Sequence, residues 1–253
     1  MIQIKNESEI EKMREGGKIL GFALSEVLKQ AKPGVTELEL DKLAEKLITE
    51  KGAQPGFKKV QGYKNTICIS TNNVVVHGVP SSYVLREGDV VGIDCGAFYK
   101  GFHTDMSQSI IVGEKKDPQI SKFLKTGELA LTHAIKEAVE GNRIGNISEV
   151  IQDMVEAGGY SVVKSLIGHG VGKQLHEEPE IPGYLGDKIE KTPLIKNGMT
   201  LAIEVIYNMG KDSVVYANKD GWTISTKDGS LSGLFERTIA VTDKNPEVLT
   251  KLL

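Results

Sequence analysis

Hydrophobic residues recur three and four positions apart in the first fifty residues and again between residues 117 and 158. This spacing places apolar side chains along one side of a helix. Ser8 and Thr36 are each followed three residues later by glutamate, and Asp117 is followed by Pro118, which are helix-start patterns. The sequence therefore predicts helices over residues 8–33, 36–52, 117 to about 141, and about 146–158.

Between and after these helices the pattern changes to short runs of apolar and β-branched residues, separated by turn residues. Strands are predicted over residues 66–70, 74–77, 90–97, 102–112, 200–207, 214–217, 222–225 and 234–241. The order of helices, strands, helices and strands predicts an α+β fold, in which two similar halves divided near residue 115 share one mostly antiparallel sheet flanked by helices. No low-complexity linker interrupts the chain, so residues 1–253 are expected to form a single domain.

Composition and charge narrow the class of protein. The 253 residues are 40% hydrophobic and 26% charged, with a net charge of -3, which gives no electrostatic reason to expect nucleic acid or an anionic membrane as a partner. Cys68 and Cys95 form neither a disulfide framework nor a zinc knuckle. The first seven residues lack the apolar core of a signal peptide, and no apolar run is long enough to span a membrane. These features predict a cytoplasmic protein.

Two aspartates lie in the hairpin predicted over residues 90–112. Asp94 and Asp105 occupy strand positions, where aspartate is unfavourable. A tight turn centred on residues 99 and 100 would place them directly opposite one another, with Cβ atoms about 4.5–5.5 Å apart. Two carboxylates at that spacing need a cation between them or a proton on one of them. The alternative is a register shifted by one residue, in which one aspartate faces solvent.

The second half of the chain repeats this pattern. Glu204 and Glu236 each interrupt an apolar strand, and Arg237 or Lys211 offers an alternative ion pair for either glutamate. His169 lies among glycines that would let the backbone turn and leave the imidazole accessible. Four carboxylates and one imidazole suffice for two divalent ions if two carboxylates bridge. This ligand set favours Mn²⁺, Fe²⁺ or Co²⁺ and also admits Zn²⁺.

Several short motifs surround these five residues. They are residues 77–80 (His-Gly-Val-Pro), 92–94 (Gly-Ile-Asp), 104–105 (Thr-Asp), 168–172 (Gly-His-Gly-Val-Gly), 176–182 (His-Glu-Glu-Pro-Glu-Ile-Pro), 202–204 (Ala-Ile-Glu) and 235–238 (Phe-Glu-Arg-Thr). With the helical opening they cover nearly the whole chain, and together they resemble the type I methionine aminopeptidases. The resemblance implies a pita-bread fold and hydrolytic removal of the initiator methionine from nascent proteins, with a preference for a small second residue. It also implies a monomer that acts near the ribosome.

The resemblance implies a role for each site residue. Asp94 would bind one metal ion, Asp105 and Glu236 would bridge two, and His169 and Glu204 would bind the other, so that a water between the ions is the nucleophile. Glu204 is also implied in proton transfer. His77 would contact the substrate and assist the leaving amide, and His176 would stabilise the carbonyl oxygen as charge develops. His103 and His133 lie in no motif of the family.

The methionine pocket implied by the resemblance contains Tyr63, Cys68 and Trp222. The chain departs from the family pattern at its rim. Leu175 stands where relatives often have an aromatic residue, and Phe57 and Val60 stand where related enzymes have cysteine and tyrosine. These differences are expected to reshape the pocket while leaving it apolar enough for an unbranched thioether. Cys68 and Cys95 are expected to be buried packing residues, because neither belongs to a Cys-His pair.

Other enzymes share the same ligand order. Prolidases, aminopeptidases that act before proline, and creatinase-like hydrolases usually carry a sizeable N-terminal domain, whereas the motifs here begin near residue 60. Type II methionine aminopeptidases insert a helical segment between the last two glutamates, but Glu204 and Glu236 are only 32 residues apart. An alternative of another class is a non-catalytic pita-bread protein that binds ribosomes or chaperone clients. Such relatives lose metal ligands, and this chain keeps all five.

Overall fold

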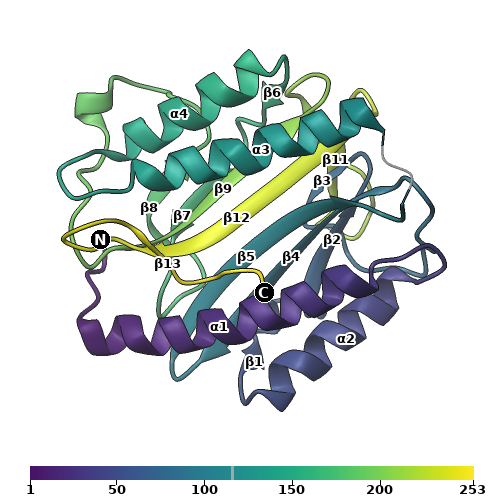
Figure 1. The fold of residues 1–253 in the computed structure, drawn as a ribbon, viewed down its shortest axis with the longest axis horizontal. Coiled ribbons are helices and arrows are strands. Elements are labelled where there is room, and N and C mark those ends of the chain that lie inside the picture. Colours follow the sequence, from purple (N-terminus) through teal and green to yellow (C-terminus); the bar gives the residue numbers. More distant parts are fainter. Residues whose placement is uncertain (115–116) are drawn as a thin grey trace.

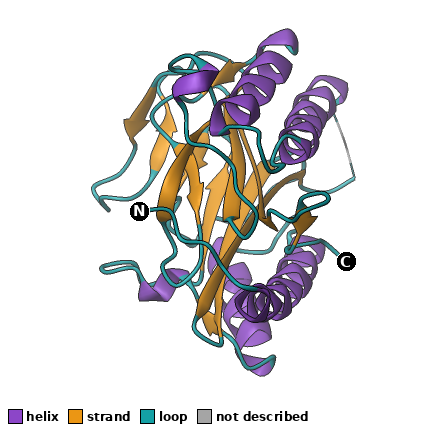
Figure 2. Cartoon of the chain, turned by 90° about the vertical axis from the view of Figure 1, so that its left-hand side faces the viewer, coloured by secondary structure: helices purple, strands orange, loops and turns teal. Residues whose placement is uncertain are grey.

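Two pairs of helices cover one face of a large antiparallel sheet (Figures 1 and 2). The computed structural model describes residues 1–114 and 117–253. The helices are α1 (Glu7–Gln30), α2 (Glu37–Glu50), α3 (Pro118–Lys136) and α4 (Ile144–Ala157). All four predicted helices are therefore present. The predicted division near residue 115 falls on residues 115–116, outside the described residues.

Capping side chains explain where these helices begin. Thr36 and Glu39 form the predicted capping box of α2, and Asp117 caps α3 by accepting a hydrogen bond from the backbone of Gln119 at 2.7 Å. The predicted cap of α1 at Ser8 is wrong. Asn6 caps this helix, and Glu9 completes the box. Both pairs have the spacing of a capping box, and the sequence alone does not choose between them.

The main sheet runs in the order β1-β4-β5-β12-β9-β7-β8, and the described pairings are all antiparallel. The strands are β1 (Gln54–Pro55), β2 (Ile67–Thr71), β3 (Val74–Val76), β4 (Val90–Tyr99), β5 (Phe102–Ile111), β6 (Ser161–Val162), β7 (Ile167–Gly170), β8 (Glu177–Pro182), β9 (Thr200–Asn208), β10 (Val214–Tyr216), β11 (Ile224–Thr226), β12 (Ser232–Ala240) and β13 (Glu247–Val248). Strands β10, β11 and β3 form a second, small sheet. Each predicted strand is present, whereas β1, β6, β7, β8 and β13 were not predicted.

The register of the β4–β5 hairpin differs from the prediction by two residues. Asp94 lies opposite Ser107, and Asp105 lies opposite Gly96. The hairpin turns at Lys100 and Gly101, whose φ angles are 47° and 90°, as a two-residue turn with two left-handed positions requires. The predicted turn was centred one residue too early. A shift of two residues leaves both aspartates on the same face of the sheet, as diagonal neighbours.

The helices bury every second residue of the central strands. Helices α1 and α2 pack with Val91, Ile93 and Cys95 of β4, and α3 and α4 pack with Ile203 and Phe235 of the neighbouring strands. Each fully buried side chain of this size contributes about 1.5–3 kcal/mol relative to exposure. Since successive side chains of a strand point to opposite faces, the residue beside each of these points away from the helices. The packing of the helices therefore sets which face the site residues occupy.

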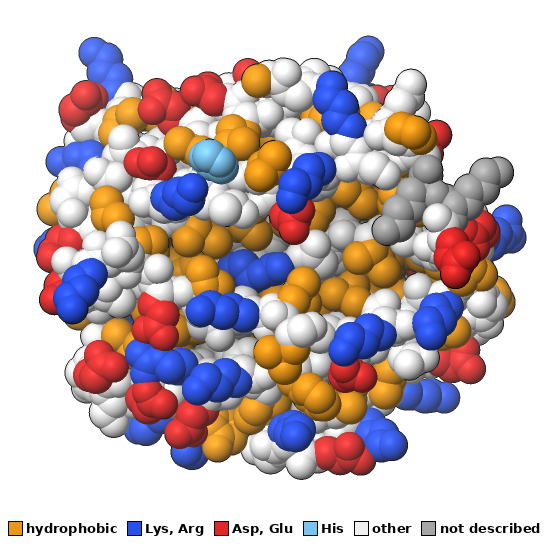
Figure 3. Space-filling model, viewed as in Figure 1, with side chains coloured by type: hydrophobic (Ala, Val, Ile, Leu, Met, Phe, Trp, Pro, Cys, Tyr) orange, Lys and Arg blue, Asp and Glu red, His pale blue; other side chains and the backbone are white. Residues whose placement is uncertain are grey.

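The outer, helical face of the molecule carries acidic and basic side chains interspersed, with hydrophobic side chains in the furrow between the two helix pairs (Figure 3). Arg237 of β12 lines a hollow on this side together with Leu131 and Ile135 of α3. No helix within residues 1–114 and 117–253 is long and apolar enough to cross a membrane. Cys68 and Cys95 are buried free thiols, as expected from the sequence.

Candidate metal centre

Three carboxylates lie in one row across four neighbouring strands. Asp94 of β4 pairs with Ser107 of β5, Ser107 pairs with Glu236 of β12, and Glu236 pairs with Glu204 of β9. Directly paired residues share a face of the sheet, and here that face is opposite the helices. Asp105 lies two residues before Ser107 and joins the row from the same face. Its backbone is held by the hydroxyl of Thr238, which accepts from the Asp105 amide and donates to the Asp105 carbonyl, both at 2.8 Å.

His169 reaches this row from β7. It pairs with Ala202, two residues before Glu204, and so points to the same face. The expectation of an accessible turn at His169 is wrong, because the flanking glycines lie in a strand between β8 and β9. A Cβ atom at Gly168 would lie 2.7 Å from the carbonyl oxygen of Ala202, and one at Gly170 would lie 2.2 Å from that of Glu178. These glycines let three strands approach closely around the imidazole.

The side chains converge at the centre of the row. The Nε2 atom of His169 lies 4.0 Å from Oδ2 of Asp105 and 3.9 Å from Oε1 of Glu236. Ligand atoms of these three residues all lie within 4.8 Å of one another. Asp105 and Glu236 are nearly inaccessible to solvent, with 4% and 3% exposure. Burying ionised carboxylates costs several kcal/mol each, so these side chains need a positive charge or bound protons to compensate.

The pKa values of the site residues reflect this unfavourable burial. Burial raises the pKa of Asp94 well above its usual value, and the charges of Asp105 and Glu204 raise it further. Burial and then the charge of Asp105 raise the pKa of Glu204 to about 8. Burial lowers the pKa of His169 to about 4, so the imidazole is neutral and free to act as a ligand. At neutral pH the carboxylates therefore hold protons that a cation would displace.

The residues present fit a divalent metal ion. The Oδ1 atom of Asp94 is buried without a hydrogen-bond partner among the described residues, although it lies in the row of carboxylates. Lone pairs of buried carboxylates are normally satisfied, so this oxygen is available as a ligand. Oxygen donors with one imidazole suit manganese, iron(II), cobalt or zinc. These five residues would hold the metal.

Two further histidines border the same cavity. His77 follows β3 with a φ angle of 55°, a left-handed conformation that costs a histidine about 1–2 kcal/mol. Gly78 follows because a Cβ atom there would lie 2.0 Å from the carbonyl oxygen of Ile69 in β2. The ring of His176 meets that of His169 edge-on, with centroids 4.4 Å apart. Burial lowers the pKa of both His77 and His176, so both are neutral near pH 7.

An apolar pocket adjoins the carboxylates. Tyr63 and Trp222 meet edge-on with ring centroids 5.1 Å apart, and Phe57, Cys68 and Leu175 complete a small buried cluster with Tyr63. Val60 and Val79 pack against it. The tyrosine hydroxyl is satisfied by the carbonyl oxygen of Ile67 at 2.7 Å. The pocket therefore presents rings, methyl groups and a thiol to a ligand.

One cavity of about 300 Å³ joins the carboxylates to this pocket. The predicted site residues that line it are Tyr63, Cys68, His77, Asp94, Asp105, His169, His176, Glu204, Trp222 and Glu236, with Phe57, Val60 and Leu175 at its rim. His133 lies exposed on α3, and His103 is buried in β5 outside this cavity. The structure thus brings together residues that are up to 179 positions apart in the sequence.

Sequence reasoning missed several residues of the cavity. Val76, Ser165, Leu166, Ile167 and Ile206 also line it. Ile206 could have been found by alternation, since it lies two residues after Glu204 and shares its face. Val76 precedes His77 directly. Residues 165–167 had no such signal, because strand β7 was itself not predicted.

Comparison with known proteins identifies the family. The pattern of metallopeptidase family M24 matches residues 11–243. A methionine aminopeptidase of Clostridium perfringens is 44% identical over 250 residues, which cover 99% of each chain. The chain belongs to metallopeptidase family M24. Its resemblance to type I methionine aminopeptidases is confirmed across the full length.

Solved structures of M24 enzymes agree with this assignment. The crystal structure of methionine aminopeptidase from Thermotoga maritima superposes with a TM-score of 0.95 at 41% identity, covering 99% of this chain and 100% of that one. Prolidase from Pyrococcus furiosus has a TM-score of 0.78 at 24% identity, and the chain covers 66% of it. The second match shows the shared fold alone. The predicted pita-bread fold is confirmed, and the M24 family together with the carboxylate cluster shows a divalent-metal enzyme.

Proposed function

We propose that this M24 enzyme removes the N-terminal methionine from newly made proteins and peptides by metal-dependent hydrolysis. The observation that carries the proposal is the single cavity in which five possible metal ligands adjoin an apolar pocket. Full-length similarity to methionine aminopeptidases supports the same activity. A protein that only binds partners does not need four buried, mutually repelling carboxylates beside an imidazole, so the binding-module alternative is disfavoured.

The residues of the cavity would have different roles in hydrolysis. The residues that would hold the divalent ions are Asp94, Asp105, His169, Glu204 and Glu236. Bound divalent cations supply a lowered water pKa and polarisation of the scissile carbonyl. Glu204 lines the cavity beside the other proposed ligands, and the family resemblance implies that it takes a proton from the attacking water and passes it on.

The histidines at the mouth would act on the peptide bond itself. A neutral imidazole can donate a hydrogen bond, and the lowered pKa values of His77 and His176 keep both rings neutral. His176 would donate to the carbonyl oxygen as negative charge develops there. His77 would contact the substrate amide and assist its departure. These roles rest on the family resemblance and on the position of both residues beside the carboxylates.

The apolar end of the cavity would bind the methionine side chain of the substrate. Tyr63, Cys68 and Trp222 would surround the methionine, with Leu175 and Phe57 closing the rim. The cavity of about 300 Å³ is large enough for a methionine side chain beside the proposed ligands. The thioether sulfur contacts aromatic edges favourably, which matches the rings of Tyr63 and Trp222. The thiol of Cys68 serves as lining, because burial raises its pKa and keeps it protonated.

We also propose the setting of this reaction. Residues 1–253 act as a single catalytic domain, monomeric and cytoplasmic, on nascent chain ends near the ribosome. No nucleic acid and no membrane is required, since the net charge of -3 gives no electrostatic attraction to either, and the helical face carries charges of both signs (Figure 3). The physiological ions are drawn from Mn²⁺, Fe²⁺, Co²⁺ and Zn²⁺.

Methionine release from short peptides tests the proposal. The metal-stripped protein should release no methionine from Met-Gly-Met, and added Mn²⁺ or Co²⁺ should restore release. Met-Leu-Met should be cleaved at least about tenfold more slowly than Met-Gly-Met, because a branched second residue crowds the mouth of the cavity. Absence of release with each of the four candidate ions would refute the proposed activity. Equal rates on the two peptides would refute the preference for a small second residue.

Variants connect the activity to the site. His169→Ala and Glu204→Ala should each lower kcat/KM at least about a hundredfold, because each removes a proposed ligand. His133→Ala is the matched control, since this imidazole is exposed on α3 and should leave the rate within about twofold. Near-normal turnover in His169→Ala or Glu204→Ala would contradict the ligand assignment.

A further inference from the structure

The segment before α1 lies beside the loop that carries His176, since Lys5, Gln174 and His176 line one hollow. The backbone amide of Lys5 donates to the carbonyl oxygen of Gly198 at 2.8 Å. A Cβ atom at Gly198 would lie 2.7 Å from the carbonyl oxygen of Lys5, so the two backbones are in close contact. This fixes Lys5 to the turn that precedes β9. The lysine side chain is then free to reach elsewhere.

The Lys5 side chain makes a buried ion pair. Its Nζ atom lies 2.5 Å from Oε2 of Glu177, and the two side chains are 5% and 7% exposed. The other oxygen of Glu177 accepts a hydrogen bond from the backbone amide of Gln174 at 3.0 Å. One carboxylate therefore joins the N-terminal segment to the loop before β8. Losing either partner would leave an uncompensated buried charge on the other.

Gly172 allows this pair to form. A Cβ atom at Gly172 would lie 2.4 Å from Cε of Lys5 and 2.9 Å from Oε1 of Glu177. The carbonyl oxygen of Gly172 accepts from the backbone amide of His103 in β5 at 2.7 Å. Residues 171–176 are therefore held between the ion pair on one side and β5, the strand of Asp105, on the other.

His176 depends on this backbone for its orientation. No described residue donates to or accepts from its imidazole, whose described ring contact is the edge-on one with His169. We propose that the Lys5–Glu177 ion pair is a positioning device that holds His176 toward the reacting carbonyl. The inference deepens the proposed function and rests on it. Lys5 is a positioning residue, since it contacts neither the cavity nor the proposed ligands.

Kinetics of Lys5→Met test this inference on the metal-loaded enzyme. We expect kcat to fall about tenfold or more with KM within about twofold, because a misplaced donor weakens the transition state more than the bound substrate. In a His176→Ala background, Lys5→Met should lower kcat by less than about twofold, since the imidazole that the ion pair would position is already absent. Lys5→Arg should restore most of the rate. Lys173→Met is the control, because it removes the exposed pair with Glu9 at 3.6 Å and should change little.

A second measurement separates this inference from the proposed function. In metal-free protein labelled with ¹⁵N-histidine, Lys5→Met should shift or broaden the His176 signals while those of His133 stay unchanged. If Lys5→Met does not fold, Lys5→Met/Glu177→Gln removes both charges and serves for the same comparisons. Unchanged His176 signals, or an equal loss of kcat with and without His176, would overturn the positioning role. A wild type without methionine release would instead refute the proposed function, and the spectra would still test the ion pair.

Discussion

At the scale of the residue, the side chains of the site destabilise the metal-free fold. Glu236 is 3% exposed in a strand, and burial raises its pKa well above the usual range. By contrast Asp41, which is also buried, accepts hydrogen bonds from the backbone of Thr66 and Ile67 and from the side chain of Asn65. One carboxylate is satisfied by donors, whereas the other is surrounded by acids. Only the first kind stabilises the metal-free fold.

Substitution at Asp94 should therefore stabilise the metal-free protein. Its folded pKa lies above the unfolded value of about 3.9, so the folded state binds more protons and stability falls as pH rises past that value. Asp94→Asn removes this loss and should raise the free energy of unfolding by about 1–3 kcal/mol at pH 7.5, with little effect near pH 3. Urea unfolding of wild type and Asp94→Asn in EDTA, at both pH values, measures this difference in the free energy of unfolding.

The control at this scale is Asp41→Asn. Its amide oxygen can still accept from the backbone of Thr66 and Ile67, but its NH2 group replaces the oxygen that accepts from the side chain of Asn65. It should destabilise the protein at pH 7.5 by about 1–3 kcal/mol. With Mn²⁺ present, wild type should gain stability that Asp94→Asn does not. Loss of stability in metal-free Asp94→Asn would show that this carboxylate is not strained as described.

At the scale of the element, local patterns predicted long helices and long strands but not short strands. Strands β7 and β8 are flanked or interrupted by glycine and proline. They exist because β7 pairs with β9 and β8 pairs with β7. The β4–β5 register depended on a turn with left-handed φ at Lys100 and Gly101, where lysine is an unusual choice. The predicted pairing of the aspartates was wrong by two residues for that reason. Both aspartates still lie on the predicted face, because a register shift of two residues leaves side chains on the same face of the sheet.

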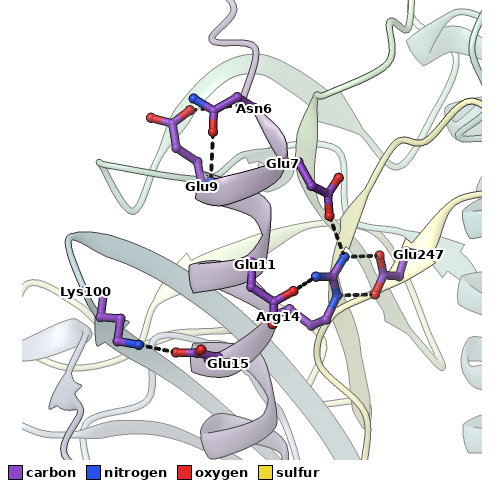
Figure 4. Close-up of polar contacts among 8 residues, drawn as sticks. All are labelled: Asn6, Glu7, Glu9, Glu11, Arg14, Glu15, Lys100 and Glu247. Atoms are coloured by element: carbon purple, nitrogen blue, oxygen red, sulfur yellow. Dashed lines mark hydrogen bonds and ion pairs between the residues drawn. The ribbon is translucent and has the colours of Figure 1, made fainter.

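Helix α1 is joined to the C-terminal strand by charge (Figure 4). Arg14 makes a two-point contact with Glu247 of β13, at 2.6 and 2.8 Å, and also contacts Glu7 and Glu11. The hydrogen bond from Arg14 lowers the pKa of Glu247. A group whose folded pKa is lowered stabilises the fold above its unfolded pKa, and this stabilisation is lost as pH falls through the folded value. Lys100 and Glu15 link the same helix to the β4–β5 turn.

Glu247→Gln should therefore lower the free energy of unfolding at pH 7 by about 0.5–1 kcal/mol, a value reduced because both side chains are partly exposed. The difference from wild type should shrink as pH falls below the unfolded pKa of about 4.3, and it should vanish once the carboxyl is protonated in both states. Glu26→Gln, which breaks an exposed pair with Lys29, should change little. Urea denaturation across this pH range measures all three proteins. A loss that persists unchanged at pH 3 would rule out the charge as its cause.

At the scale of the whole molecule, the sheet order assembles the site from both halves of the chain. Asp94 and Asp105 come from strands packed under α1 and α2, and Glu204 and Glu236 from strands packed under α3 and α4. The β5–β12 contact at the centre brings the two sets into one row. Misplaced carboxylates in strands were visible in the sequence, and so was the resemblance that grouped them. The row itself was not, because pairing between distant strands leaves no local pattern.

The same limit applies to the loop of His176. Its motif was visible, but its attachment to Lys5 depends on a contact between residues 172 positions apart. Gly172 and Gly78 looked like turn residues, and their function is instead to let backbones and side chains approach closely. The metal and substrate roles of the ten cavity residues stay predictions that rest on the resemblance and on their common location.

Anomalous diffraction from crystals grown with Mn²⁺ tests the central claim most directly. Two manganese peaks about 3.5–4 Å apart should lie among the carboxylates and imidazole, at about 2.0–2.3 Å from their oxygen and nitrogen atoms. Asp105 and Glu236 should contact both peaks, Asp94 one of them, and His169 and Glu204 the other. Manganese bound elsewhere, with these five side chains turned away from it, would contradict the account.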